Sequence, residues 1–183
     1  MKSLAKPAGA LYRAAMLEIV PENPERDAAA IEALYDRTFG PGHFAKTAER
    51  LREFNASLPE ISRVARKDGR LVGVCRVWPI RVGDQQALFY GPVAIEPDEQ
   101  GNRLGLSVTG EALEAGEAAG WSAAVLIGAP AYFGEIGFQG VPHGRLTLPG
   151  PQDYARLMWR DLAGDAQTLD GAVTALKAPE LVG

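Results

Sequence analysis

The segment GPVAIEPDEQGNRLGLS, residues 91–107, decides the fold, because it joins a broken strand to a glycine-bearing turn and then to a helix. Proline has no N–H to donate to a strand ladder, so the pair Gly91-Pro92 predicts a bulge. The turn from Glu99 to Gly105 aims backbone N–H groups outward, and the following helix adds positive potential at its N-terminus. These features predict a phosphate site, although the loop alone also fits a plain turn. It matches neither the Walker nor the dinucleotide glycine pattern.

The part of the chain before this segment predicts two helices and then a hairpin. Apolar residues at spacings of three and four indicate the helices, and the strands that follow are joined by the turn KDGR. A further strand leads into the broken pair. The expected elements are a strand over residues 16–20, helices over 28–39 and 44–57, and strands over 62–66, 71–80 and 87–95.

The part of the chain after this segment predicts a helix and a buried strand. Apolar residues from Leu104 to Ala119 step by four, four, three and four, so they share one helix face. WSAAVLIG, residues 121–128, is a continuous apolar run typical of a strand covered on both faces. Together they predict a βαβ unit. The later expectations are a short helix within 129–138 that closes at Gly137, a strand over 145–148, a turn or helix over 153–162 and a strand near 173–176.

Composition limits the classes of function. The 183 residues, 46% of them hydrophobic, suffice for one domain, expected over residues 16–183 after a loose extension over 1–15. A net charge of −4 argues against nucleic acid and anionic lipid as partners. No apolar run reaches the roughly 18 to 20 residues of a membrane helix, and no cluster of ligands indicates a metal site. The single cysteine, Cys75, excludes an internal disulfide and suits the cytoplasm. The oligomeric state stays open, with a homodimer as one option.

Three separated pieces carry a family resemblance: the broken strand LFYGPVAI, the glutamine-initiated loop QGNRLG and the segment AYFGEIGF. In this order, over residues 71–138, they resemble the GNAT superfamily of N-acetyltransferases. The resemblance implies an α/β (α+β) fold, with a mixed, mostly antiparallel central sheet that is splayed at a bulged strand and flanked by helices. It also implies an acyltransferase that moves an acetyl group from acetyl-CoA to a primary amine on a small molecule or peptide.

The resemblance implies that acetyl-CoA is held at two places. Pantetheine amides pair like an extra strand with Val93, Ala94 and Ile95, and a strand opened at Gly91-Pro92 has backbone groups that need such a partner. The diphosphate lies on the loop, held chiefly by backbone N–H groups. The remaining cofactor-binding residues implied by the resemblance are Gln100, Gly101, Asn102, Arg103, Leu104, Gly105, Ser107 and Phe133.

Arg103 stands where the family's loop pattern has a glycine. If its backbone keeps an ordinary helical conformation, its side chain either points away from the phosphates or lies alongside them and adds a charge-assisted contact. Glu96, Asp98 and Glu99 lie just upstream and repel a diphosphate unless they face solvent. In the second posture Arg103 also offsets these carboxylates.

The acid and the base of the reaction are left open by the resemblance. The family's usual tyrosine donor corresponds to Phe133, and Tyr132 is one residue off, a turn of about 100° on a helix. Tyr132 therefore reaches the leaving sulfur through a shifted helix, or solvent protonates the thiolate, or the protein binds acyl-CoA and transfers poorly. Glu96 and Tyr90 are the candidates for the base.

Two functions follow from these observations. The first is direct attack of a primary amine on acetyl-CoA, without an acyl-enzyme, because no cysteine is suitably placed. The second is a CoA-binding regulatory or vestigial module with little turnover, which Phe133 favours. In the family the acceptor cleft is lined by the first two helices, including the region of His43, and by the late strands.

Overall fold

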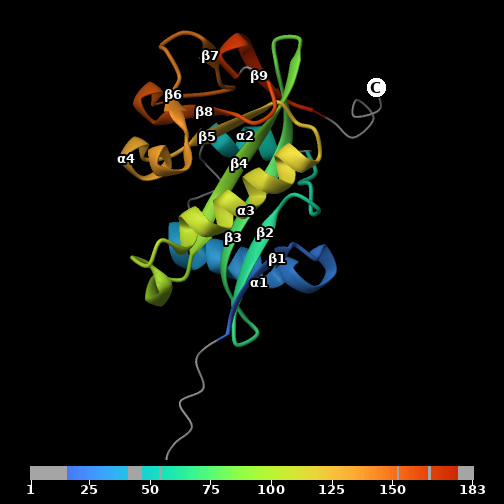
Figure 1. Cartoon of the computed structure of the whole chain (residues 1–183), viewed down its shortest axis with the longest axis vertical. Coiled ribbons are helices and arrows are strands. Elements are labelled where there is room, and N and C mark those ends of the chain that lie inside the picture. Colours follow the sequence, from blue (N-terminus) through green and yellow to red (C-terminus); the bar gives the residue numbers. More distant parts are fainter. Residues whose placement is uncertain (1–15, 41–46, 54, 152, 165, 177–183) are drawn as a thin grey trace, which may run out of the picture.

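The computed structural model describes residues 16–40, 47–53, 55–151, 153–164 and 166–176. Its central sheet is mostly antiparallel and is flanked by helices, which confirms the predicted fold class (Figure 1). The extension predicted over residues 1–15 and the first three residues of the helix predicted over 44–57 lie outside the described residues.

The centre of the molecule is one sheet. Its strands are β1 (Leu17–Pro21), β2 (Arg63–Lys67), β3 (Arg70–Val82), β4 (Gln85–Ile95), β5 (Ala123–Ile127), β6 (Gln139–Gly140), β7 (Leu146–Thr147), β8 (Leu157–Asp161) and β9 (Gly171–Ala175). They lie in the order β1-β2-β3-β4-β5-β8-β6, and β9 pairs with β3 and β7. Strands β4 and β5 run parallel. Helix α3 (Leu104–Ala118) joins them, which confirms the predicted βαβ unit.

The other α-helices are α1 (Pro24–Phe39), α2 (Thr47–Arg52) and α4 (Pro130–Phe133). Helix α1 begins where the Asn23 side chain accepts a hydrogen bond from the N–H of Arg26 at 3.1 Å. Pro24 suits the first helical position because its missing N–H would have no partner there. Helix α3 is followed by Gly120, whose φ of 84° ends the helix. Among the described residues, no helix has the length and apolarity to cross a membrane.

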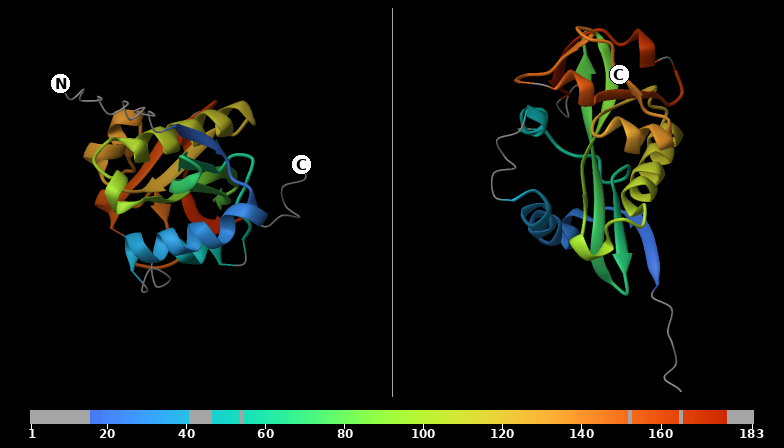
Figure 2. Two further views of the ribbon diagram at one scale, coloured as in Figure 1. Left: turned by 90° about the horizontal axis from the view of Figure 1, so that it is seen from below. Right: turned by 90° about the vertical axis from the view of Figure 1, so that its left-hand side faces the viewer.

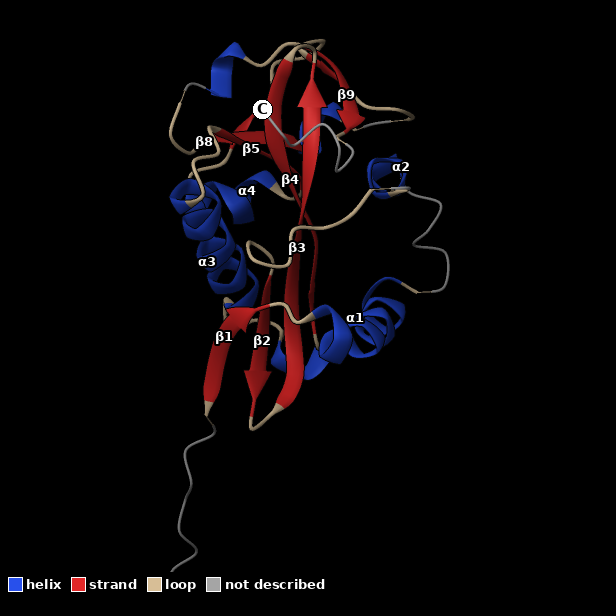
Figure 3. Ribbon diagram, turned by 90° about the vertical axis from the view of Figure 1, so that its right-hand side faces the viewer, coloured by secondary structure: helices blue, strands red, loops and turns tan. Residues whose placement is uncertain are grey.

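The two long helices cover opposite faces of the sheet (Figure 2, Figure 3). Val108 and Leu113 of α3 are buried in one core cluster. Ile31 and Leu34 of α1 are buried in another, against β2 and β3. Because successive side chains of a strand point to opposite faces, each residue of β4 faces either α3 or the side of α1 and α2.

The predicted bulge at Gly91-Pro92 is confirmed. Val93 pairs with Cys75 and Tyr90 pairs with Val77, so two residues of β4 stand opposite one residue of β3. The bulge breaks the alternation of β4 and allows the strand to leave its other neighbour.

Two predicted elements are wrong in part. The helix predicted to reach residue 57 ends at Arg52, because the Asn55 side chain donates hydrogen bonds to the carbonyls of Leu51 at 3.2 Å and Pro79 at 2.9 Å. The segment predicted as a turn or helix over 153–162 begins with the turn η4 (Tyr154–Arg156) but continues as strand β8. A short apolar run does not distinguish a buried strand from a helix.

Candidate active site

A cavity of about 700 Å³ lies where β4 and β5 part. The two strands pair only from Leu88 to Tyr90, and past the bulge β4 keeps β3 as its neighbour. Gly105 and Tyr132 line the cavity on the side of α3 and α4, and Phe39 and Arg52 line it on the side of α1 and α2. The cavity thus opens toward both faces of the sheet, and its volume suits a small ligand.

The residues expected to pair with pantetheine lie at this open edge. Val93 and Ile95 line the cavity, while Ala94 faces the core beneath α1. All three pair with β3 on one side. On the other side the pairing of β5 with β4 stops at Leu126. The backbone groups on that side are therefore available to an extended ligand, except the Ile95 carbonyl, which accepts a hydrogen bond from the Gln100 side chain.

The loop before α3 leaves several N–H groups available. Gly101 and Arg103 have positive φ values of 86° and 66°, a geometry that turns neighbouring N–H groups to one side. The Asn102 side chain accepts a hydrogen bond from the N–H of Leu104 at 3.1 Å. Within the described ranges, the N–H groups of Asn102, Arg103 and Gly105 have no hydrogen-bond acceptor. The positive end of α3 thus carries unpaired donors.

Three further predicted residues attach this loop to its neighbours. The Gln100 side chain donates a hydrogen bond to the carbonyl of Ile95 at 3.1 Å, which ties the loop to the open strand. Leu104 is buried in the core beneath α3. Ser107 is exposed one turn later, with its hydroxyl 3.5 Å from the carbonyl of Arg103.

The assumption of an ordinary helical backbone at Arg103 is wrong. Arg103 precedes α3 with φ 66° and ψ 11°, in the left-handed region that favours glycine. Its guanidinium forms an ion pair with Glu135 of the turn η3 (Gly134–Ile136). The side chain therefore reaches from the loop to the segment that follows α4.

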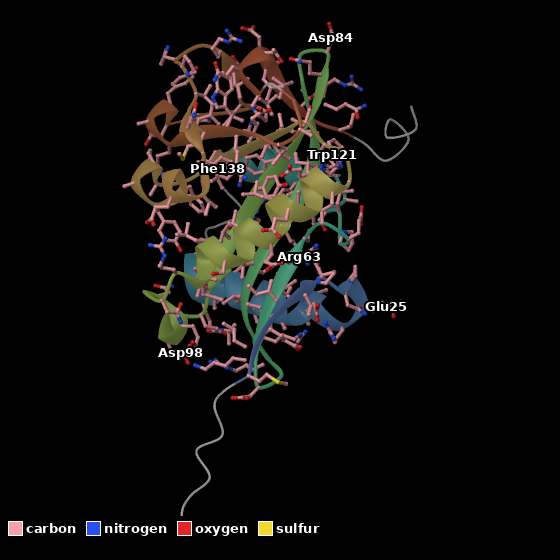
Figure 4. All side chains as sticks on the ribbon, in the orientation of Figure 1. Glu25, Arg63, Asp84, Asp98, Trp121 and Phe138 are labelled. Carbon is pink, nitrogen blue, oxygen red and sulfur yellow. The ribbon has the colours of Figure 1, made fainter. Side chains whose placement is uncertain are left out.

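The three acidic residues before the loop are each paired with a cation behind it. Glu96 and Glu99 are buried, whereas repulsion from a diphosphate would favour carboxylates that face solvent. Lys67 and Arg70 flank the turn between β2 and β3, and Asp98 lies beside that turn (Figure 4). The pairs are Glu96 with Arg37 at 2.5 Å, Asp98 with Arg70 at 2.9 Å and Glu99 with Lys67 at 2.6 Å.

The two candidates for the base have their polar groups turned away from the open edge. The Glu96 carboxylate is directed to α1, where it accepts hydrogen bonds from Arg37. Tyr90 contributes to the cavity wall, but its hydroxyl lies beneath α3 and donates to the carbonyl of Ala112 at 3.4 Å. Burial raises the pKa of Tyr90 well above its usual range. This geometry disfavours both residues as proton acceptors.

Tyr132 and Phe133 have different surroundings. A Cβ placed on Gly105 would lie 2.7 Å from the Tyr132 hydroxyl, so this hydroxyl stands over the first turn of α3. Phe133 is 8% exposed and meets Phe138 edge-on, with ring centroids 6.3 Å apart. Both residues line the cavity, and the polar one is nearer the loop.

The far wall of the cavity contains residues that sequence reasoning did not single out. These residues come from three segments that are far apart in the sequence, so no local motif predicts the wall. His43 lies outside the described residues. The residues in question are Thr38, Phe39, Arg52, Pro151, Asp153 and Arg156.

Comparison with known proteins agrees with this arrangement. Residues 28–138, more than half of the chain, match the acetyltransferase (GNAT) family. The uncharacterized N-acetyltransferase YhbS of Escherichia coli K12 is 29% identical over 143 residues, which cover 76% of this chain and 84% of that protein. The crystal structure of Escherichia coli YhbS in complex with CoA has a TM-score of 0.75 at 26% identity and covers 96% of this chain and 98% of that one. A GNAT family acetyltransferase from Brucella melitensis, in complex with acetyl-CoA, has a TM-score of 0.66 at 25% identity and covers 89% and 97%. The chain therefore belongs to the GNAT family of acetyltransferases.

Proposed function

We propose that the protein transfers the acetyl group of acetyl-CoA to a primary amine in the cavity between β4 and β5. The observation that carries this proposal is the opening of the sheet at the bulge, which gives Val93 to Ile95 a free edge leading to α3. The two related structures are complexes with CoA and with acetyl-CoA, which supports acetyl-CoA as the cofactor.

The residues of the site fit this cofactor. The unpaired N–H groups of Asn102, Arg103 and Gly105 would hold the diphosphate, and the edge from Val93 to Ile95 would hold the amides of the pantetheine arm. Gly105 is needed because a side chain there would fill the space below Tyr132. In this scheme Gln100, Gly101, Leu104 and Ser107 shape the loop, and Phe133 forms part of the wall. The bound cofactor supplies the acetyl group as a thioester.

Transfer by direct attack suits the groups in the cavity. The amine nitrogen bonds to the acetyl carbon, the carbon–sulfur bond breaks, the amine loses a proton and the thiolate gains one. Cys75 does not serve as a nucleophile, because it is buried and burial raises its pKa to about 12. The reaction therefore needs proton transfer rather than a covalent enzyme intermediate.

Tyr132 is the proposed donor of the proton to the thiolate. Its hydroxyl stands over the first turn of α3 and borders the cavity, whereas Phe133 has no proton to give. With Glu96 and Tyr90 engaged elsewhere, water in the cavity takes the proton of the amine. We further propose that residues 16–183 are one domain, that the protein acts in the cytoplasm, and that the acceptor is a small molecule or peptide rather than nucleic acid.

The second candidate is a CoA-binding module with little turnover, which Phe133 at the usual tyrosine position favours. Both candidates are tested by thermal unfolding of the full chain with acetyl-CoA, followed by a free-thiol assay across a panel of primary amines. The acetyltransferase predicts a rise in Tm and thiol release with at least one amine. A rise in Tm without thiol release from any amine supports the binding module. The absence of any rise in Tm refutes both.

A further inference from the structure

The wall of the cavity opposite the loop is rich in guanidinium groups. Among its described residues, the charged side chains on this wall are Arg52, Asp153 and Arg156. One oxygen of the Asp153 carboxylate, Oδ1, accepts a hydrogen bond from the N–H of Ala155 at 3.0 Å. Among the described residues no ion pair joins Asp153 to Arg156, so the Arg156 guanidinium can attract an anion.

The backbone of the exposed residue Arg156 is fixed beside the point where the sheet opens. Its carbonyl accepts a hydrogen bond from the N–H of Gly128 at 2.9 Å, immediately after β5. The next residue, Leu157, pairs with Ile127 at the end of that strand. The backbone that carries the guanidinium is thus anchored to the same strand end that borders the cavity.

The Arg156 guanidinium has no partner in the part of the chain that the structure describes. Its situation differs from that of Arg37, Arg70 and Arg103, each of which pairs with a carboxylate. A planar guanidinium on a cavity wall can hold a carboxylate through two parallel hydrogen bonds.

Arg52 is placed on the same wall by a separate element. It is the last residue of α2, and its neighbour Leu51 is 1% exposed, which anchors the helix in the core. The Asn55 side chain closes the helix by bonding to the carbonyls of Leu51 and Pro79. Phe39 and Phe89 line the cavity too, so a carbon chain or ring has apolar surfaces to contact.

Building on the proposed function, we propose that the acceptor is a small amine that carries a carboxylate. Arg156 binds the carboxylate, and the amino group at the other end of the molecule points to the open edge of β4. An amino acid is then held with its amine positioned for attack, whereas the corresponding carboxamide cannot form the charge-assisted hydrogen bonds with the guanidinium. Arg156 acts in specificity and takes no part in the proton transfers.

The test compares kcat/KM for acids and their carboxamides at several spacings between the amine and the carboxylate. The probes are glycine, β-alanine, 4-aminobutyrate and phenylalanine, each with its amide, and rates are corrected for the fraction of unprotonated amine. We expect the acid to be preferred about tenfold or more in at least one pair. Equal rates for acid and amide in every pair would overturn the inference.

Variants of Arg156 locate the source of that preference. Arg156→Gln should raise KM for the preferred acid about tenfold and leave KM for its amide and for acetyl-CoA within about twofold, and Arg156→Lys should recover part of the loss. Arg160→Gln is the matched control, because Arg160 lies on β8 and does not line the cavity. An equal rise in KM for acid and amide, or a rise in KM for acetyl-CoA, would contradict the assignment of Arg156 to the acceptor.

The failure of this inference is distinct from failure of the proposed function. Benzylamine, whose only ionisable group is its amine, is included in the panel for this reason. Thiol release from benzylamine together with no preference for acids would sink the acceptor class alone. No thiol release from any amine would sink both proposals.

Discussion

Arg103 offers a direct test of the geometry of the loop, because it combines a backbone conformation that favours glycine with a side chain that forms an ion pair. The two variants Arg103→Gly and Arg103→Ala both remove the pair with Glu135. Only the glycine also relieves the positive φ of 66°. The difference between them therefore isolates the backbone term.

The expected magnitudes follow from this geometry. A residue with a Cβ in the left-handed region costs about 1–2 kcal/mol of stability relative to glycine. Replacing it by glycine removes this strain, but about 0.5–1 kcal/mol is lost again because glycine has more conformational entropy in the unfolded chain. The glycine variant should thus exceed the alanine variant by about 0.75 kcal/mol in the free energy of unfolding, the difference between the midpoints of these two ranges. The ion pair, with side chains 63% and 42% exposed, contributes about 0.2–1 kcal/mol, so alanine should fall below wild type and glycine should come close to it.

Thermal unfolding measures this difference, since about 1 kcal/mol shifts Tm by about 2–4 °C in a protein of this size. Acetyl-CoA affinity, measured by calorimetry, should stay within a few fold in Arg103→Gly, because backbone N–H groups supply the donors. An alanine variant as stable as the glycine variant would refute the left-handed assignment at Arg103. A loss of affinity of about tenfold or more in both variants would show that the guanidinium itself holds phosphate.

Four further outcomes are expected. Gly105→Val should abolish acetyl-CoA binding, while Gly110→Val, where a Cβ meets nothing within 4 Å, should retain it; equal affinities would remove Gly105 from the cofactor site. Tyr132→Phe should lower kcat about tenfold or more with KM for acetyl-CoA little changed, and an unchanged kcat would assign the proton to solvent. Lys67→Met should weaken acetyl-CoA binding about three- to tenfold, because the Glu99 charge loses its cationic partner and repels the diphosphate. Adding Glu99→Gln should restore the affinity, and a double variant without restored affinity would show that the loss is structural. Asp27→Asn should cost about 3 kcal/mol in the free energy of unfolding near neutral pH, because it breaks a buried ion pair with Arg66. Burial acts to raise the pKa of Asp27, but hydrogen bonds from Arg26 and Asn23 and the charge of Arg66 outweigh it and lower that pKa. The gap between wild type and variant in urea titrations should therefore be full above the unfolded pKa of about 3.9 and shrink as the pH falls below it.

The fold and the cofactor half of the site could be predicted because their signals are local. A proline that lacks an N–H predicts the bulge at Gly91-Pro92, and apolar spacing predicts helix α3. The glycine-bearing loop lies between them in the chain, so the sequence order of the pieces is also their spatial order. One contiguous segment therefore contains most of the surface proposed for acetyl-CoA.

The acceptor half could not be predicted because its residues meet only through tertiary structure. Arg52 precedes strand β2 and Arg156 follows strand β7, so the two residues lie far apart in the sequence. Strand β8, which positions Arg156, was expected to be a turn or helix. Glu96 looked like a base because it follows the open strand, but its carboxylate is directed to Arg37 of α1. Spacing along the sequence does not predict which cationic side chain will pair with a carboxylate in the folded protein.

The acidic residues beside the loop illustrate how such long-range pairs set the chemistry of a local motif. Glu96, Asp98 and Glu99 would place negative charge next to a diphosphate, and the exposed Arg103 was the obvious candidate to offset them. The structure pairs them instead with cations from α1 and the β2–β3 turn, and Arg103 pairs with Glu135. Because pairs with a buried partner are screened less than exposed ones, the compensation of Glu96 and Glu99 persists at ordinary salt, whereas the exposed pair of Asp98 with Arg70 is screened more. The loop is then left with its backbone donors and the end of α3 as the groups that attract phosphate, which is why a side chain in the glycine position can be tolerated there.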